Sequence, residues 1–383
     1  MTLVCDQAGQ CGGCPDHARS LAEQRRAKRD ALVAAWIAQG LDGERVGAAE
    51  LRDAGALGFR ERLDLRIADG ALGLLSAAGA LVPLRTCPLA TPSLASWFAL
   101  FAADLPPLAG EGARASVRLR VPPADLGTGG DPLGLWIDLG HAQLKALVDE
   151  GAWLARWAPR ATLELGPKGR VVQLADGRVV LGAACPAVWS ATWLAGRPIP
   201  LTSRVMDFGQ PGSGPSRVLV AAVLEAVRAS GARRILELGA GGGNLSIPLA
   251  FDAGLDVRAL ELDTSGLVAN AARVPEKMRR SGHLEAIAAS YERADSVAGW
   301  VHGRDAIVCD PARGGLGRFI DGLATLAPSL RPASIVYVSC HLPALAKDAA
   351  RLAALGWIAR DVRGVDQFPW TPHSEWIVRF ERA

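Results

Sequence analysis

A cysteine at the end of an apolar strand is the residue of this chain with the clearest chemical potential. The run 334–338 is short, apolar and β-branched, which predicts a buried parallel strand. Cys340 follows Ser339, and Pro343 then begins a helical pattern. In open α/β sheets, ligands bind at such a strand-to-helix corner. A free cysteine is often an inert packing residue, but its place at this corner favours a nucleophile.

Two predicted turns contain carboxylates that are candidate partners of the Cys340 thiol. Asp310 opens an Asp-Pro-Ala-Arg turn after the predicted strand 305–309, and Glu375 ends a loop that contains two prolines, 35 residues after Cys340. Prolines fix the backbone of a loop, which suits the rigid placement of a side chain. Either carboxylate could instead be an ordinary turn or surface residue, so these turns alone do not establish a function.

A glycine-rich turn follows the predicted strand 234–238. A dinucleotide fingerprint requires a third glycine where Asn244 stands. The pattern E-x-G-x-G-x-G, which begins at Glu237 and includes Gly239, is instead similar to that of S-adenosylmethionine-dependent methyltransferases. Glu261 ends the next strand, where a carboxylate can accept hydrogen bonds from both ribose hydroxyls. A packing turn with a surface glutamate is the alternative, but the pair of features favours a nucleoside cofactor.

Four of the seven cysteines form a candidate metal site. Cys5, Cys11 and Cys14 have the spacing C-x5-C-x2-C, and Cys87 precedes a proline. Four thiolates suit either zinc or a [4Fe–4S] cluster, and the spacing does not separate them from each other. A site without metal is the third possibility. We expect Cys185 and Cys309, the remaining two besides Cys340, to be packing residues.

Three segments must position these residues. Residues 1–50 hold the Cys-rich segment and a helix over about 16–39 with Leu32, Trp36 and Ile37 on its apolar side. Residues 51–202 show short alternating runs separated by turns, which predict a mostly antiparallel β domain with one or two helices, one of them near 142–157. Residues 203–383 alternate strands and helices, which predicts a doubly wound parallel sheet with an antiparallel strand plausible at its end. The expected strands there are 234–238, 256–261, 284–288, 305–309, 334–339, 357–363 and 375–381.

The composition excludes several classes of protein. The 383 residues are 50% hydrophobic and 21% charged, so the chain is globular and not disordered. No run of 18 apolar residues occurs, which argues against a membrane span or signal peptide and for a cytoplasmic protein. The net charge is only +3 and does not by itself indicate nucleic acid. The basic clusters at 25–29 and at Arg60, Arg62 and Arg66 fit either phosphate contacts or solvated faces.

Taken together, these motifs resemble the RNA uracil-5-methyltransferases over essentially the whole chain. Members carry a Ser-Cys-Asn-Pro segment, matched here around Cys340, and an Asp-Pro-Pro-Arg turn, matched by the segment that starts at Asp310. Their Phe-Pro-x-Thr-x-His-x-Glu loop is matched by 368–375, and their Phe-x-Gln segment by 208–210. The resemblance implies a Rossmann-like class I methyltransferase domain that follows the β-rich, RNA-binding domain in the sequence.

The resemblance also implies a role for each matched residue. Cys340 would be the nucleophile and Glu375 the general base. Phe208 would stack on the substrate base. The positions that would contact the cofactor, S-adenosylmethionine, or the substrate are Gln210, Gly239, Asn244, Glu261 and Asp310. Ala312, His341 and Gly239 depart from the usual residues of the family, but none of them replaces the nucleophile, the base or the ribose carboxylate.

The implied chemistry accounts for these residue types. Carbon 5 of uracil is a poor nucleophile, and addition of a thiolate at carbon 6 makes it an electron-rich enolate carbon. After methyl transfer, a base on a rigid loop removes the proton from carbon 5 and the cysteine leaves. A uridine within folded RNA must first be unstacked, at a cost of a few kcal/mol.

Ribosomal-RNA members of the resembled family carry a [4Fe–4S] cluster on the same cysteine arrangement, so the resemblance favours that cluster, with a structural role. We therefore expect an enzyme most similar to the short 23S ribosomal-RNA methyltransferases. A transfer-RNA enzyme is the nearest alternative. An RNA-binding protein that keeps the fold without turnover and an iron–sulfur redox enzyme with a nucleotide cofactor are the other two.

Overall fold

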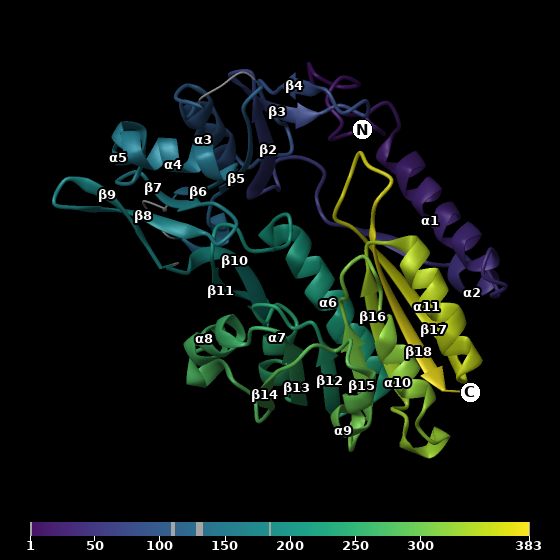
Figure 1. Ribbon diagram of the computed structural model, residues 1–383. Coiled ribbons are helices and arrows are strands. Elements are labelled where there is room, and N and C mark those ends of the chain that lie inside the picture. Colours follow the sequence, from purple (N-terminus) through teal and green to yellow (C-terminus); the bar gives the residue numbers. More distant parts are fainter. Residues whose placement is uncertain (1, 109–111, 128–132, 184, 383) are drawn as a thin grey trace. The chain divides into compact units, whose positions relative to one another are not determined.

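The computed structural model describes residues 2–108, 112–127, 133–183 and 185–382 (Figure 1). Tertiary contacts divide the chain into two compact units. The first unit contains Met1–Ser20, Gly55–Ala191 and Pro200–Gly214, and the second contains Leu21–Ala54, Thr192–Ile199 and Pro215–Ala383. The domain boundaries at 50/51 and 202/203 stay predictions.

The first unit is built on an eight-stranded sheet with the order β4-β3-β2-β5-β6-β7-β8-β9. Its strands are antiparallel, as expected, except that β6 and β7 are parallel. The bounds are β2 Arg62–Ala68, β3 Ala71–Leu75, β4 Leu81–Pro83, β5 Arg114–Arg120, β6 Leu133–Leu139, β7 Ala161–Leu165, β8 Arg170–Ala175 and β9 Arg178–Gly182.

Helices α3 (Pro92–Ala102), α4 (His141–Glu150) and α5 (Ala152–Trp157) belong to the same unit. The single helix predicted near 142–157 is wrong, because it is broken into α4 and α5 at Gly151. Gly151 has φ +62°, which ends α4 and starts α5. Aromatic side chains of α3 and α5 pack against each other in the core, with Trp97 and Trp157 ring centroids 5.3 Å apart.

The two-stranded sheet of β10 (Ala187–Leu194) and β11 (Arg197–Ser203) is divided between the two units, as is the start of α6 (Ser213–Ser230). The second unit has its own eight-stranded sheet with the order β1-β17-β18-β16-β15-β12-β13-β14. Its strands are β1 Glu50–Asp53, β12 Arg234–Leu238, β13 Asp256–Glu261, β14 His283–Ala288, β15 Ala306–Cys309, β16 Ser334–Ser339, β17 Trp357–Asp366 and β18 Glu375–Arg382.

All seven strands predicted for this region are present. The antiparallel strand is β18, and it lies between β16 and β17. The short strand β1 was not predicted; it pairs in parallel with β17 at the edge of the sheet.

Helices cover the second sheet. Besides α6, they are α1 Leu21–Ile37, α2 Glu44–Gly47, α7 Ser246–Phe251, α8 Ser265–Arg273, α9 Val297–Val301, α10 Arg318–Ala324 and α11 Leu342–Ala354. Apolar residues of α1, α2, α9, α10 and α11 form one core with alternate strand residues such as Leu236, Ile307 and Ile335. The residues between them, such as Val308 and Val336, are also fully buried, so both faces of the sheet are covered.

Helix α1 packs against α11, and its buried face differs from the predicted one (Figure 1). Leu32 and Trp36 are buried as expected, but Ile37 is 60% exposed. Gln24 and Lys28 continue the buried stripe toward the N-terminus at i, i+4 spacing. The pattern of apolar residues did not predict this part of the buried face, because two polar side chains occupy its core-facing positions. The solvated-face alternative for the basic cluster at 25–29 is therefore wrong for Lys28.

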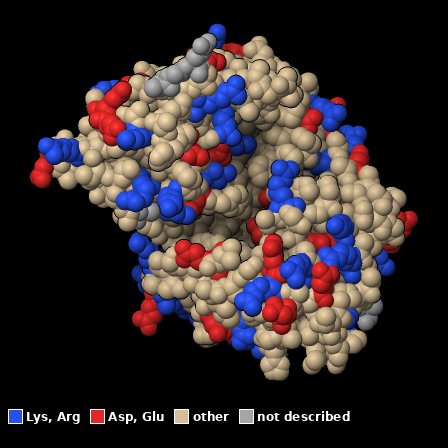
Figure 2. Space-filling view, viewed as in Figure 1, with Lys and Arg blue, Asp and Glu red and all other residues tan. Residues whose placement is uncertain are grey.

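No helix in the described part of the chain is long and apolar enough to cross a membrane. Figure 2 shows lysine and arginine side chains interspersed with aspartate and glutamate over the visible face, as the small net charge leads one to expect.

Candidate active site

The carboxyl ends of β12, β13, β15 and β16 bring several predicted residues to one edge of the second sheet. The parallel register pairs Leu238 with Leu260 and with Cys309, and Cys309 with Tyr337. The residues that follow these strands, among them Gly239 and Asp310, therefore leave the sheet at the same edge.

Cys340 and Glu375 are placed by the antiparallel register of β16 and β18. Ser339, the last residue of β16, pairs with Trp376, so Cys340 follows β16 directly beside the start of β18, where Glu375 stands. The charge of Glu375 is one of the causes that raise the pKa of the Cys340 thiol, so the two side chains lie close to each other. The sheet itself thus sets a thiol beside a carboxylate that lies 35 positions away in the sequence.

The electrostatics of this pair follow from burial and like charge. Burial raises the pKa of the half-buried Cys340 thiol to about 11, with further contributions from Glu375 and Asp310, while the positive charge of Arg313 lowers it. Burial, with Asp310 as the second cause, also holds the pKa of Glu375 well above its usual range. The pKa of Asp310 itself is raised to about 7 by burial. Both partners therefore favour their neutral forms.

Several buried polar atoms around the pair have no hydrogen-bond partner among the described residues. They are Oε2 of Glu375, Nδ1 of His341, which follows Cys340, and both amide atoms of Gln367, which begins the loop before Glu375. Unpaired buried polar groups are rare in folded proteins, and a catalytic role or a bound water or ion is among their explanations. His373 of the same loop has a lowered pKa because of burial and the positive charges of Arg313, Lys28 and His341.

The glycine-rich loop is held by Glu261. Gly241 N–H donates to Glu261 Oε2 at 2.7 Å, and Leu262 N–H donates to Oε1 at 2.8 Å. A carboxylate has about four acceptor sites, so capacity for the two hydroxyls of a ribose remains. Gly239 has φ +73°, a conformation that favours glycine.

Asn244 braces the helix that precedes the loop in the sequence. Its Oδ1 accepts a hydrogen bond from the Ser216 hydroxyl at 3.0 Å, and its carbonyl oxygen accepts one from the Thr192 hydroxyl at 2.7 Å. These contacts favour a structural contribution from Asn244 besides the predicted cofactor contact.

Two residues near this edge were missed by the sequence reasoning. Glu237 on β12 is 2% exposed, and burial, followed by the charges of Asp310 and Glu261, raises its pKa to about 7. Tyr291 lies beside Gly239, because a Cβ added to that glycine would be 3.7 Å from the tyrosine Cε1. The E-x-G pattern was a signal for Glu237, whereas no motif surrounds Tyr291.

Phe208 and Gln210 belong to the first unit, where three arginines hold the backbone of their loop. Arg62 Nη1 donates to the Gly209 carbonyl at 2.7 Å, and the Arg62 guanidinium lies 5.6 Å from the Phe208 ring centroid. Arg118 and the buried Arg120 both donate to the Asp207 carbonyl. Phe208 is 78% exposed, whereas Gln210 is half-buried.

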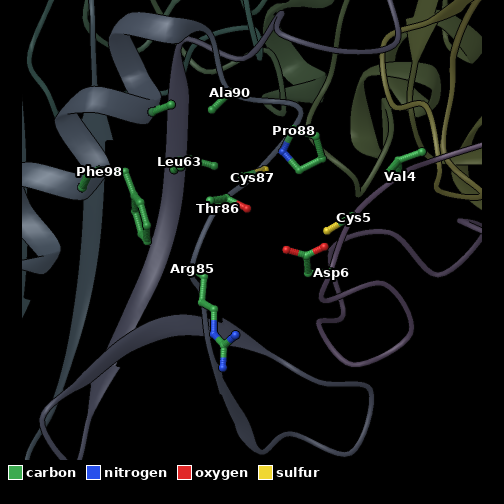
Figure 3. A pocket seen from close by; sticks show the side chains of 12 residues that line it. Val4, Cys5, Asp6, Leu63, Arg85, Thr86, Cys87, Pro88, Ala90 and Phe98 are labelled. Atoms are coloured by element: carbon green, nitrogen blue, oxygen red, sulfur yellow. The ribbon is translucent and has the colours of Figure 1, made fainter.

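The four cysteines of the candidate metal site also lie in the first unit. Burial raises the pKa of Cys14 to about 12, with contributions from Cys87, Cys11 and Cys5, so the other three thiols lie within electrostatic range of Cys14. Gly13 N–H donates to Cys11 Sγ at 3.3 Å. Figure 3 shows Cys5 and Cys87 lining one cavity of about 260 Å³.

The donor chemistry of these cysteines fits a metal or an iron–sulfur cluster, but their geometry does not yet form a ligand set. In the described residues, no group of three or more Cys, His, Asp or Glu side chains is arranged to hold a metal ion. Of the remaining cysteines, Cys309 is fully buried as predicted, and Cys185 is exposed, so its prediction as a packing residue is wrong.

Comparison with known proteins completes this description. No protein-family model matches the chain. An uncharacterised RNA methyltransferase of Bdellovibrio bacteriovorus is 29% identical over 384 residues, which cover 100% of this chain and 96% of that relative. The 23S rRNA (uracil(1939)-C(5))-methyltransferase of Aromatoleum aromaticum is 28% identical over 398 residues, which cover 99% of this chain and 85% of the relative.

A solved structure has the same fold. The Pyrococcus abyssi tRNA (uracil-54, C5)-methyltransferase, crystallised with S-adenosyl-L-homocysteine, matches with a TM-score of 0.67 and 20% identity, over 99% of this chain and 88% of that one. This likeness confirms the predicted fold class.

Proposed function

The chain belongs to the RNA uracil-5-methyltransferase family, and from this premise we propose that it methylates carbon 5 of a uridine in RNA with S-adenosylmethionine. The observation that carries the proposal is that Cys340 directly follows β16 and Glu375 begins the paired strand β18, close enough for its charge to act on the thiol. A nucleophilic thiol and a carboxylate base beside it are the two groups that substitution at carbon 5 requires.

In the proposed reaction, Cys340 acts in the first step and Glu375 in the last. The Cys340 thiolate adds to carbon 6, and the electron pair displaced onto the ring makes carbon 5 nucleophilic. Carbon 5 takes the methyl group, which the cofactor supplies as an electrophile. Glu375 then accepts the proton of carbon 5, the carbon–sulfur bond breaks, and the thiolate is restored. Because burial weakens the acidity of Glu375, its carboxylate is a stronger base than a solvated one.

The charge of the sheet edge supports the choice of cofactor. Glu237, Glu261, Asp310 and Glu375 converge there. Burial raises the pKa of the first, third and fourth, and repulsion from neighbouring carboxylates adds to the effect at Glu237 and Glu375. A cationic ligand lowers the energy of such a cluster of carboxylates. The sulfonium and ammonium groups of S-adenosylmethionine give it that character.

The remaining contacts are proposed from the family resemblance. Gln210, Gly239 and Asn244 would contact the cofactor or substrate, and the exposed Phe208 ring would stack on an unstacked base. We favour 23S ribosomal RNA as the substrate because full-length relatives are named for it. Transfer RNA is the alternative, because the solved structure that shares the fold is a transfer-RNA methyltransferase.

We also propose a structural [4Fe–4S] cluster on Cys5, Cys11, Cys14 and Cys87. The shared electrostatic range of the thiols supports it, as do the backbone N–H groups of Leu89 and Ala90 that hydrogen-bond to Cys87. Protein purified without oxygen should be brown, absorb near ~400 nm and contain about four irons per chain. Colourless protein with one zinc per chain would exclude the cluster.

The test of the proposed function is methyl transfer to defined RNAs. Purified protein and labelled S-adenosylmethionine are incubated with unmodified 23S ribosomal-RNA segments or with unmodified transfer RNA, and 5-methyluridine is mapped. Cys340→Ala should abolish product while RNA binding is retained, and Cys185→Ala, which removes an exposed thiol, should act as wild type. Methylation by Cys340→Ala at the wild-type rate would remove Cys340 from the mechanism.

A further inference from the structure

Helix α1 presents an unusual polar face to the interior of the second unit. Gln24 and Lys28 lie one turn apart, and they are 1% and 2% exposed. Lysine is almost never so completely buried unless it is paired. The face is therefore directed at specific partners and is not a surface that phosphate groups can reach.

Those partners are the last residue of β17, Asp366, and residues of the loop between β17 and β18. Lys28 Nζ donates to Asp366 Oδ1 at 2.6 Å and to the Phe368 carbonyl at 2.9 Å. Arg25 Nε donates to Asp366 Oδ2 at 3.0 Å, so both carboxylate oxygens are engaged. Trp370 N–H donates to Gln24 Oε1 at 2.7 Å. Three residues of α1 thus hold both the beginning and the middle of the loop.

The loop needs such support because its backbone is strained. Trp370 is fully buried and has φ +67°, a conformation that bulky side chains rarely adopt. Within the loop, the Thr371 hydroxyl donates to the Phe368 carbonyl at 2.8 Å. Glu375, the proposed base, is the residue at which this loop enters β18.

Stability alone does not account for a buried ion pair at this place. Apolar side chains of similar volume often serve a protein core equally well, because two charges must be removed from water to form the pair. A pair that joins a helix to a strained loop restricts the loop to one geometry. That restriction is what a carboxylate acting on one carbon atom requires.

We propose that Lys28 and Gln24 of helix α1 are positioning residues for the base Glu375, which they place by fixing the loop 366–371. This inference rests on the proposed function. It assigns the N-terminal helix a task in the last stage of the reaction, when the proton leaves carbon 5 and the carbon–sulfur bond breaks. Formation of the adduct depends on Cys340, which precedes α11 and is not part of the loop.

The proposal separates the two halves of the reaction. In Lys28→Met, the covalent adduct between Cys340 and the RNA should form at the wild-type rate, because the nucleophile is undisturbed. Its resolution to 5-methyluridine should slow by about 100-fold, the effect of a misplacement of ~1 Å. The methylated RNA should therefore accumulate as a protein-linked species.

The experiment is a single-turnover reaction with labelled S-adenosylmethionine, sampled over time on denaturing gels that separate free from protein-linked RNA. Glu375→Gln, which removes the base, is the reference for a blocked second half. Arg26→Met is the matched control, since Arg26 is an exposed cation on the same helix. Any phosphate contact of Arg26 would change RNA affinity but leave the rate of adduct resolution unchanged.

The variants also distinguish positioning from folding. Loss of Lys28 leaves the buried Asp366 carboxylate with one partner fewer. The double variant Lys28→Met/Asp366→Asn, which also removes this charge, is therefore measured in parallel. If Lys28→Met alone does not fold, the double variant takes its place. Slow resolution with normal adduct formation supports the proposal. Wild-type resolution, or an equal loss of both stages in a folded variant, overturns it. If Glu375→Gln itself accumulates no adduct, the proposed function fails instead.

Discussion

The pKa of Cys340 can be tested directly by alkylation. A thiol with the ordinary pKa of 9.0 is about one-tenth ionised at pH 8, whereas a thiol with a pKa of about 11 is ionised in about one molecule in a thousand. Because the thiolate is the reactive form, iodoacetamide should modify Cys340 at pH 8 about 100-fold more slowly than an ordinary exposed thiol. The rate should rise about tenfold for each pH unit until the pH approaches about 11.

Two variants should move this profile in opposite directions. Glu375→Gln removes a negative neighbour and should move the midpoint of Cys340 to lower pH, and Arg313→Met removes a positive neighbour and should move it to higher pH. If the midpoint moves by about one pH unit, the alkylation rate at pH 8 changes about tenfold. Peptide mass spectrometry resolves the seven cysteines, and the exposed Cys185 serves as the internal reference for reagent. A wild-type midpoint at or below 9, or a change in the same direction in both variants, would refute this account of the site.

Two further predictions concern stability. Gly315→Ala should lower the free energy of unfolding by about 1–3 kcal/mol. The reason is that Gly315 has φ +80° and that an added Cβ would lie 2.4 Å from Asp348 Oδ2. Urea denaturation measures this free energy. Gly314→Ala, with open space around its Cβ, should change it by less than about 0.5 kcal/mol, and equal effects would contradict the argument. Burial raises the pKa of Glu61 to about 7 despite hydrogen bonds from Ser213, so its contribution to stability is present below about pH 4.5 and is lost as the pH rises through 7. The stability of wild type relative to Glu61→Gln should therefore fall by up to about 3 kcal/mol between pH 5 and pH 8, and a difference that does not depend on pH would exclude this titration.

The parallel sheet could be predicted because its strands are apolar, β-branched runs separated by helical patterns. The run 334–338 is an example, and its bounds agree with β16. Strand β1 has the sequence Glu50-Leu-Arg-Asp53, without a β-branched residue, and forms because β17 offers it an edge. A local pattern carries no information about such pairing, which depends on a partner more than 300 residues away in the chain.

The buried face of α1 was also beyond the reach of the sequence. Lys28 lies within a basic run, and nothing around it indicates that its partner is Asp366. The same holds for Tyr291, which lies beside Gly239 without any motif. Motifs identified residues that act through their chemical type, whereas residues that act by holding a neighbour are recognised only when the neighbour is placed.

The arrangement of β18 explains why such holding residues matter. Register in a sheet is set in steps of one residue, and a slip of one residue would turn Glu375, which precedes the paired Trp376, to the other face of the sheet. The paired strands β16 and β18 prevent that slip, with Trp376 and Ile377 fully or almost fully buried. The ladder of β18 with β16 begins at Trp376 and its ladder with β17 begins at Glu375, however, so on its loop side the proposed base depends on contacts outside β16 and β18. A chemical step that needs a carboxylate fixed to within a fraction of an ångström must therefore draw on residues beyond that ladder, and in this chain they come from the helix that follows the cysteine segment.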